Sequence, residues 1–214
     1  RAIYLTLYPF TRREIKETMD QTPVLIHLLR TGSLPEREVI GLAWTEILKG
    51  GMPTICLGMV KSADIWFRGY EQTYLERDIR SLSQVADLVS FRHLLQLIAF
   101  RNAQIFKQSE LARDAKLNAM TTARYLSLME TSFVIRRVPP FLGNPASRLI
   151  KSPKLYMSDA GLAAYLMGIK SPSDTGPLFG NLLENYFVQN ADGIITAHEP
   201  DIKLSYWNIQ GRYE

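Results

Sequence analysis

The sequence has few residues that could form covalent or metal cross-links. Its 214 residues include one cysteine, Cys56, and three histidines that are far apart, so we expect no internal disulfide and no zinc site. It contains no charged-then-apolar leader and no apolar run long enough to cross a bilayer. We therefore expect a cytoplasmic protein that has no contact with a membrane and holds no metal or other cofactor in this chain.

Motifs for a complete catalytic site are also missing. The phosphate-binding loop GxxxxGK[ST], whose glycines let the backbone approach phosphates, does not occur. No serine or cysteine nucleophile can be paired with a base. The string KLYMSDAG at 154–161 imitates a strand ending in a magnesium-binding carboxylate, but Asp159 is more simply the cap of a helix over 160–167 that Gly168 ends. The sequence therefore predicts no activity for this chain alone.

Most of the chain has the pattern of helices. We expect a strand over 2–8, stopped by Pro9, and then a helix capped by Thr11 with Glu14. Apolar spacing and end signals predict further helices over 23–31, 35–48, 62–79 and 85–100, with the Gly50-Gly51 pair ending the second of these. The fold class expected is mainly α with small β elements.

Residues 108–138 predict a helix-turn-helix. Ser109 can cap a short helix whose small residues Ala112 and Ala115 allow close crossing, and Lys116 to Asn118 form a tight turn before a helix over 119–130. We expect this second helix to bury Met120, Ala123, Leu126 and Met129. Strands over 133–138 and 154–157 then complete a winged helix over 84–157.

The predicted winged helix is the basic part of the chain. Between 77 and 154 there are 13 Lys and Arg and five Asp and Glu, a net charge of +8, whereas the whole chain carries +4. Such charge over a helix-turn-helix favours DNA, with the second helix in the major groove and arginines near phosphates. The alternative is a module for protein docking or oligomer assembly. The candidate DNA-binding residues are Lys116, Thr121, Thr122, Arg124, Tyr125, Arg136, Arg137, Arg148 and Lys151.

The C-terminal part predicts the beginning of an α/β fold. An amphipathic helix over 178–190 carries Glu184 near its centre, and 201–208 has the pattern of a strand. A helix with an inward carboxylate followed by a hairpin is how nuclease-like folds begin a metal site. One carboxylate cannot hold a hard cation usefully, so Glu184 is either a nuclease-like candidate or a structural or surface residue.

The ordered set of motifs resembles a large family of prokaryotic AAA-type ATPases with a C-terminal conserved domain of unknown function. The motifs are RAIYLTLYPFTRREI, GGMPT, YLERDI, SELARDAKLNAMTTARYLSLME, SPKLYMSDAGLAAYLMGI, LFGNLLENYFVQN and YWNIQGRYE. The resemblance implies that the phosphate loop precedes residue 1, that ATP and Mg belong to the parent protein, and that Arg1 is a candidate to reach a nucleotide phosphate. It also implies that an acidic residue of a nuclease-like fold follows residue 214.

The resemblance therefore implies an excised piece of a larger protein. Its parts are the end of the ATPase core (1–22), a helical lid-like region (23–83), the winged helix (84–157) and the start of a restriction-endonuclease-like α/β domain (158–214). We expect the parent to be an ATP-dependent DNA-interacting protein, in which this piece contacts DNA and the ATPase core. A homo-oligomer is a further expected assembly, and a metal-dependent nuclease would need residues beyond 214.

Overall fold

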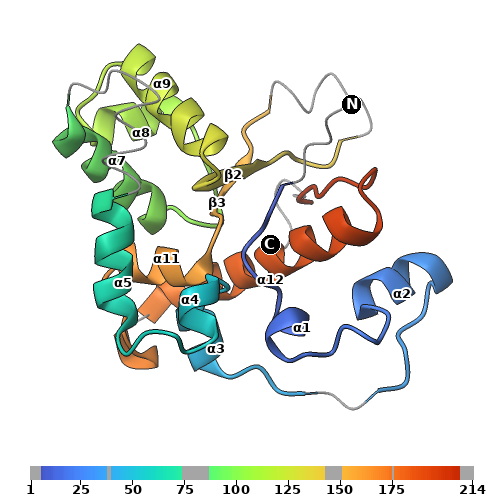
Figure 1. Ribbon diagram of the computed structural model, residues 1–214. Helices are drawn as coiled ribbons and strands as arrows, with labels where there is room; N and C mark the ends of the chain where they lie inside the picture. Colours follow the sequence, from blue (N-terminus) through green and yellow to red (C-terminus); the bar gives the residue numbers. More distant parts are fainter. Residues whose placement is uncertain (1–5, 38–39, 74–86, 143–150, 175, 208–214) are drawn as a thin grey trace, which may run out of the picture.

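The computed structural model describes residues 6–37, 40–73, 87–142, 151–174 and 176–207 (Figure 1). These residues form mainly helices, with one three-stranded antiparallel sheet. The expected mainly α chain with small β elements is confirmed at this level. The candidates Arg1 and Arg148, and residues 2–5 of the expected first strand, lie outside the described residues.

The described residues of the first part of the chain form the short helices α1 (Arg12–Ile15), α2 (Val24–Thr31), α3 (Trp44–Lys49), α4 (Pro53–Cys56) and α5 (Ala63–Tyr70). The expected start of α1 is confirmed, because Thr11 and Glu14 form a reciprocal capping box. The helix over 23–31 is also confirmed, and Gly32 ends it with a φ of 72°. Helix α3 ends at Gly50, as the Gly-Gly pair predicted.

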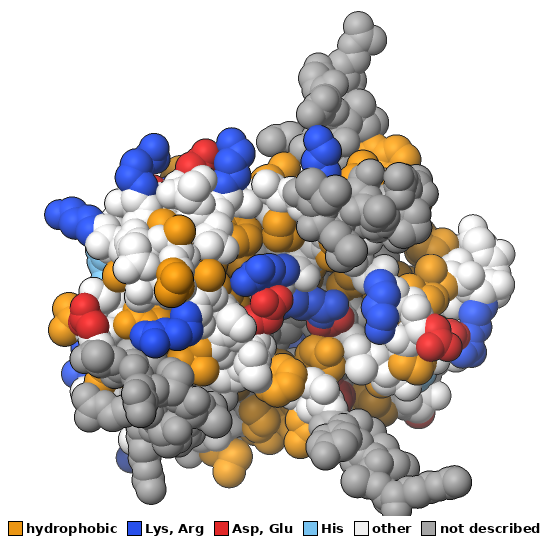
Figure 2. Space-filling model, turned by 90° about the horizontal axis from the view of Figure 1, so that it is seen from above, with side chains coloured by type: hydrophobic (Ala, Val, Ile, Leu, Met, Phe, Trp, Pro, Cys, Tyr) orange, Lys and Arg blue, Asp and Glu red, His pale blue; other side chains and the backbone are white. Residues whose placement is uncertain are grey.

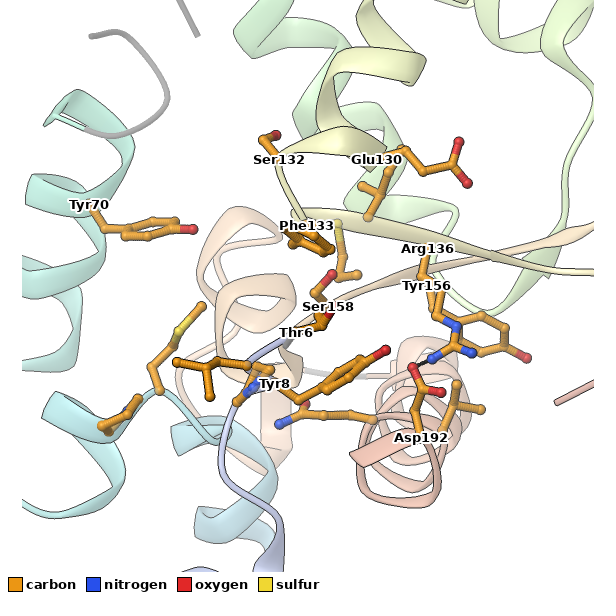
Figure 3. Close-up of a pocket in the computed structure, with 18 residues that line it drawn as sticks. Thr6, Tyr8, Tyr70, Glu130, Ser132, Phe133, Arg136, Tyr156, Ser158 and Asp192 are labelled. Atoms are coloured by element: carbon orange, nitrogen blue, oxygen red, sulfur yellow. Dashed lines mark ion pairs between the residues drawn. The ribbon is translucent and has the colours of Figure 1, made fainter. Parts of the chain in front are cut away.

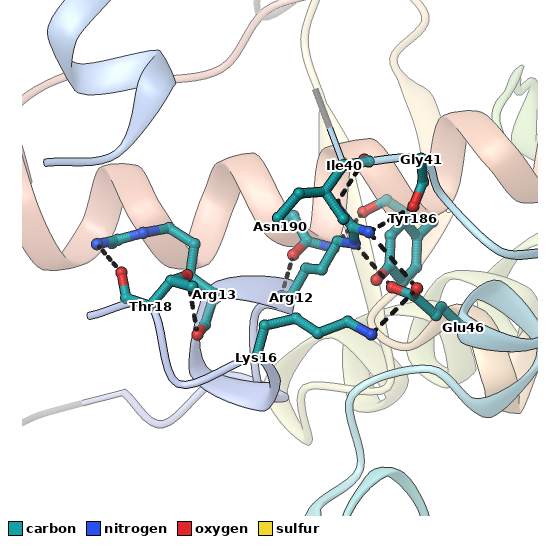
Figure 4. Close-up of polar contacts among 9 residues, drawn as sticks. All are labelled: Arg12, Arg13, Lys16, Thr18, Ile40, Gly41, Glu46, Tyr186 and Asn190. Atoms are coloured by element: carbon teal, nitrogen blue, oxygen red, sulfur yellow. Dashed lines mark hydrogen bonds and ion pairs between the residues drawn. The ribbon is translucent and has the colours of Figure 1, made fainter. Parts of the chain in front are cut away.

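Two predictions for this part were wrong. Residues 6–8 form no strand, and Leu7 is 92% exposed. The helix expected over 35–48 begins only at Trp44. One physical reason lies in Arg12, whose guanidinium donates hydrogen bonds to the carbonyls of Ile40 and Gly41 at 3.3 and 2.7 Å (Figure 4). The Arg12 side chain thus donates to carbonyl oxygens that would accept from backbone N–H groups if the helix extended over residues 40 and 41.

The middle part contains α7 (Leu88–Phe100), β1 (Gln104–Ile105), α8 (Gln108–Asp114), α9 (Ala119–Thr131), β2 (Ile135–Val138) and β3 (Lys154–Met157). The sheet order is β1-β3-β2, and both pairings are antiparallel. Asp87 caps α7 and Asn118 caps α9 through their side chains. Helix α8 starts two residues earlier than expected, because its N-cap is Lys107 rather than Ser109.

The last part contains α11 (Ala160–Leu166), two short 3-10 turns (Pro172–Asp174 and Gly176–Leu178) and α12 (Phe179–His198). Helix α12 extends eight residues beyond the end expected at 190. The strand expected over 201–208 is wrong for its described residues, 201–207, which make one isolated bridge between Tyr206 and Pro140. The described residues after α12 therefore contain no hairpin of a nuclease-like sheet.

One hydrophobic core joins the three parts. Helix α12 crosses the molecule below the sheet, and α7, α8 and α9 stand at one end (Figure 1). Fully buried side chains from α3, α7, α9, α11 and α12 share the same core cluster, among them Ile47, Leu94, Leu126, Leu162 and Leu182. The helix-turn-helix is therefore packed on the C-terminal helices rather than held by a linker.

Candidate nucleic-acid interface and neighbouring polar sites

Helix α9 is the helix expected to enter a DNA groove, and its buried face differs from the expected one. The buried residues are Thr122, Tyr125, Leu126 and Met129, whereas Met120 is 84% exposed. Tyr125 packs edge-to-face against Phe91 of α7, with ring centroids 5.2 Å apart. Thr122 donates its hydroxyl hydrogen bond to the backbone oxygen of Asn118 at 2.9 Å. The expectation that Thr122 and Tyr125 lie on the outer face is therefore corrected.

The outer face of α8 and α9 keeps some of the predicted residues. Lys116 is exposed in the tight turn, where its φ is 55°, and Arg124 is exposed one helical turn beyond Met120. Thr121 is half-buried, and its backbone N–H donates to Asn118 Oδ1 at 2.7 Å. Lys151 is exposed just before β3. Within the described ranges, neither Lys116, Arg124 nor Lys151 makes an ion pair.

The two arginines of β2 are in a different setting. Arg136 forms an ion pair with Asp192 of α12, a residue that is only 5% exposed. Burial lowers the pKa of the Arg136 guanidinium. Arg137 is paired with Glu130 at the end of α9, with 3.3 Å between Nε and Oε2. Both were expected to approach phosphates, but each already has a carboxylate partner in the fold.

Most other described cations of the basic segment are also paired, and two of their partners, Glu71 and Glu184, come from outside it. Lys and Arg side chains are spread over the face shown in Figure 2, several of them beside Asp or Glu. The exposed positive charge is therefore smaller than the sequence count suggests. The further pairs are Arg92 with Glu71, Arg101 and Arg113 with Asp114, Lys107 with Glu110, and Lys154 with Glu184.

Glu184 lies beside a cation and a phenol. Its Oε1 accepts from Lys154 Nζ at 2.9 Å and from the Tyr156 hydroxyl at 2.5 Å. Burial, and then the bond to Glu184, raise the pKa of Tyr156. The part of the chain that the structure describes has no cluster of three residues able to hold a metal ion. The contacts of Glu184 are thus those of a structural counter-ion between β3 and α12.

A buried polar junction connects the Gly50-Gly51 turn to α11 and α12. Asp159 is fully buried, and its carboxylate accepts from the backbone N–H groups of Gly51 and Leu162 at 2.7 and 2.8 Å. The expected capping role of Asp159 is confirmed. Gln189 of α12 accepts from the N–H of Ala160 at 2.8 Å. Burial raises the pKa of Asp159, so the junction holds this carboxylate at an energetic cost that its hydrogen bonds offset.

A pocket of about 560 Å³ lies between residues 6–9, the sheet and α12 (Figure 3). Apolar side chains such as Phe133 form much of it, and the Arg136 and Asp192 pair lies at one side. Sequence reasoning missed this pocket because its walls come from segments far apart in the chain. Its lining includes two carboxylates, Glu130 and Asp192, and the part of the chain that the structure describes has no group of three residues able to hold a metal ion.

A family model described as "Domain of unknown function (DUF8612)" matches residues 42–173. The chain belongs to this family. The matched DUF8612 region includes all described elements from α3 through α11, and thus the whole helix-turn-helix and its sheet.

Two relatives come from mycobacteria. Uncharacterized proteins of Mycobacterium tuberculosis and Mycobacterium bovis are each 28% identical to this DUF8612 chain over 189 residues, which is 86% of the chain. The chain spans 42% of the length of these relatives. No solved structure matches it. Among the described residues, no helix has the length and apolar character needed to cross a bilayer.

Proposed function

We propose that α7 to β3 form a winged-helix module that binds duplex DNA through α9 and the turn before it. The order of elements supports this: helix, strand, helix, helix and then two strands, with the first strand paired to the last. In such modules the second helix of the helix-turn-helix enters the major groove. The observation that carries the proposal is that Lys116 in that turn and Arg124 on that helix are exposed and make no ion pair with any described residue.

The proposed contact surface is narrower than the sequence suggested. Lys116, Arg124 and the half-buried Thr121 stay in it, and Lys151 can reach a phosphate from the start of β3. Arg136 and Arg137 leave it, because Asp192 and Glu130 already neutralise them. Few phosphate contacts imply modest affinity that depends on salt and varies little with sequence.

The resemblance extends the proposal to the parent protein. We propose that the parent is an AAA-type ATPase that binds ATP and Mg outside this chain, and that this module couples DNA to the ATPase core. The length of the mycobacterial relatives leaves room for such a core, because the chain spans 42% of them. Finding a phosphate loop in the parent sequence before residue 1 would support this part, and its absence would contradict it.

A second function, protein docking or oligomer assembly, is favoured by one observation. Met120 on α9 and Val89 on α7 are 84% and 78% exposed, although both are large apolar residues. Exposed apolar side chains are common on partner-binding surfaces. In this case charge reversal on α9 would change the mass of the assembly and leave DNA affinity unaltered.

Fluorescence anisotropy with labelled duplex DNA at several salt concentrations tests DNA binding directly. We expect binding at low salt that weakens as salt rises. In a plot of the logarithm of the binding constant against the logarithm of the salt concentration, the slope should be about −0.9 for each phosphate contacted. The double variant Lys116→Glu/Arg124→Glu is expected to weaken binding by at least about 10-fold and to make the salt slope shallower by about 2 units.

The control variant is Lys61→Glu, which reverses an exposed lysine in the loop before α5. It changes net charge in the same sense but lies outside α8 and α9. The loss of affinity for each reversed charge should be smaller for Lys61→Glu than for the double variant Lys116→Glu/Arg124→Glu. Equal losses would mean that DNA is attracted by the net charge of the chain and not by these two residues. No binding at low salt would exclude the DNA proposal, and altered mass in a sedimentation run would favour assembly.

A further inference from the structure

The start of α9 has one exposed apolar side chain with an exposed cation on the helix after it and another in the turn before it. Met120 is the second residue of the helix, Lys116 precedes it by four residues and Arg124 follows it by four. Residues four apart lie on the same side of a helix, so Arg124 shares the side of Met120, whereas Lys116 lies in the turn before α9. The opposite side is accounted for by Thr122, Tyr125, Leu126 and Met129, which are buried against the core.

Met120 is therefore exposed because it lies on the side of α9 that faces solvent. Its position in the first turn of the helix indicates what it could contact. The N-terminal residues of a recognition helix are those that reach base edges in the major groove. The side chain of Asn118 caps α9 through the N–H of Thr121, which fixes the first turn that carries Met120. The first turn of α9 thus presents a flexible apolar side chain on an ordered backbone.

The charges around Met120 favour nucleic acid over an apolar protein surface. An exposed methionine in a docking patch is expected to have apolar neighbours, because such patches are contiguous. The residue one turn along its own helix face is instead Arg124, and Lys116 lies in the turn before the helix; both are exposed and without ion pairs among the described residues. Exposed cations on the helix and in the turn before it fit contacts with the phosphates of a nucleic acid.

We propose that Met120 contacts the C5-methyl group of thymine in the major groove, so that the module prefers sites containing thymine at one position. Thymine is the base that presents a methyl group there, and apolar side chains recognise it. This inference rests on the DNA binding proposed above. It assigns to Met120 the discrimination between bases, and to Lys116 and Arg124 the sequence-independent attraction to phosphates.

The test compares two short mixed-sequence duplexes rich in A·T pairs, identical except that deoxyuridine replaces every thymidine in one. This change removes the C5-methyl groups and keeps the Watson–Crick pairing. For the unaltered chain we expect the thymine duplex to bind about fourfold more tightly, the ratio for burying one methyl-sized group at about 0.8 kcal/mol. Anisotropy titrations of both duplexes at the same salt concentration measure this ratio.

Two substitutions at Met120 separate a protein contact from an effect of DNA shape. Met120→Gln keeps the length of the side chain but makes its end polar, and we expect a ratio near one. Met120→Leu stays apolar and is expected to keep most of the preference. Because Met120 is 84% exposed, neither change should disturb folding.

Each outcome is decisive. A preference lost in Met120→Gln and kept in Met120→Leu supports the inference. Salt-sensitive binding with equal affinity for both duplexes overturns the inference and leaves the proposed DNA binding intact. A preference that persists in Met120→Gln overturns it as well, because the methyl groups then act through the DNA itself. No binding to either duplex overturns the inference together with the proposed function.

Discussion

The junction around Asp159 and the outer face of α9 both carry polar side chains, but these side chains have different partners. In the junction, Asp159 accepts hydrogen bonds from Gly51 and Leu162, and all three groups are enclosed. The charges of Arg124 on α9 and of Lys116 in the turn before it have no counter-ion among the described residues. A buried polar group must be satisfied inside the fold, whereas an exposed cation remains free to meet an outside partner.

The β2 arginines lie between these two cases. Arg136 belongs to the basic segment by sequence, but its partner Asp192 is on α12 and almost fully buried. Like Asp159 in the junction, and unlike Arg124 on α9, Arg136 therefore has its partner inside the fold. Variants of the junction and of Arg136 should change the free energy of unfolding, whereas variants of the α9 face should change binding alone.

The largest expected effect is that of Gly50→Ala. Gly50 has φ 65° and ψ −152°, a combination that is open almost only to glycine, and an added Cβ would lie 2.3 Å from Asp159 Oδ1. Strain and the clash with a buried carboxylate should lower the free energy of unfolding by about 3 kcal/mol or more. Urea denaturation followed by circular dichroism measures the change.

Gly58→Ala separates backbone strain from close packing. Gly58 also has a positive φ, 68°, but an added Cβ would have open space around it. We expect a loss of about 1 to 2 kcal/mol from the left-handed conformation alone. If both variants lose the same amount, the approach of Gly50 to Asp159 contributes nothing and the junction is not as tight as described.

The next effect is expected for Arg136→Gln. This change leaves the buried Asp192 without its cation, which should cost about 2 to 3 kcal/mol, less than for a fully enclosed pair because the Arg136 side chain is 30% exposed. In the double variant with Asp192→Asn the two losses should not add. Chemical denaturation of the four proteins in this cycle gives the coupling energy.

Arg124→Gln is the matched case on the other surface. Its stability should stay within about 0.5 kcal/mol of the unaltered chain, since Arg124 is exposed and makes no ion pair with a described residue. Folded Arg136→Gln should bind duplex DNA normally, and Arg124→Gln should bind it less tightly. The reverse assignment would show that β2, and not α9, faces the DNA.

The sequence predicted features that depend on residues close together in the chain, and it missed features that depend on residues far apart. The bounds of α9 and β3 were close because caps and apolar spacing act within a few residues. The junction was not foreseen, since Gly51 and Asp159 are 108 residues apart. On α9 itself, we counted Met120 as a core residue. The predicted buried face was therefore rotated about the helix axis relative to the observed one, and Thr122 was expected on the outside.

A loss of stability smaller than those of Gly50→Ala and Arg136→Gln is expected at Glu46, which links α3 to α1. It accepts from Arg12 Nε at 2.7 Å and lies 3.4 Å from Lys16 Nζ (Figure 4). The hydrogen bond from Arg12, partly offset by burial, lowers the pKa of Glu46 below its ordinary 4.5. A carboxyl whose pKa is lower in the folded state stabilises the fold above its unfolded pKa, and this contribution is lost as pH falls through the folded pKa.

Glu46→Gln should therefore cost about 1 kcal/mol at neutral pH, because the pair is partly exposed, and progressively less below pH 4.5. Urea denaturation of both proteins over this pH range measures the difference. Glu36→Gln is the control, since Glu36 is exposed and makes no ion pair with a described residue. The difference in the free energy of unfolding between Glu46→Gln and the unaltered chain could instead stay constant with pH. That result would mean that the charge of Glu46 does not account for its effect on stability.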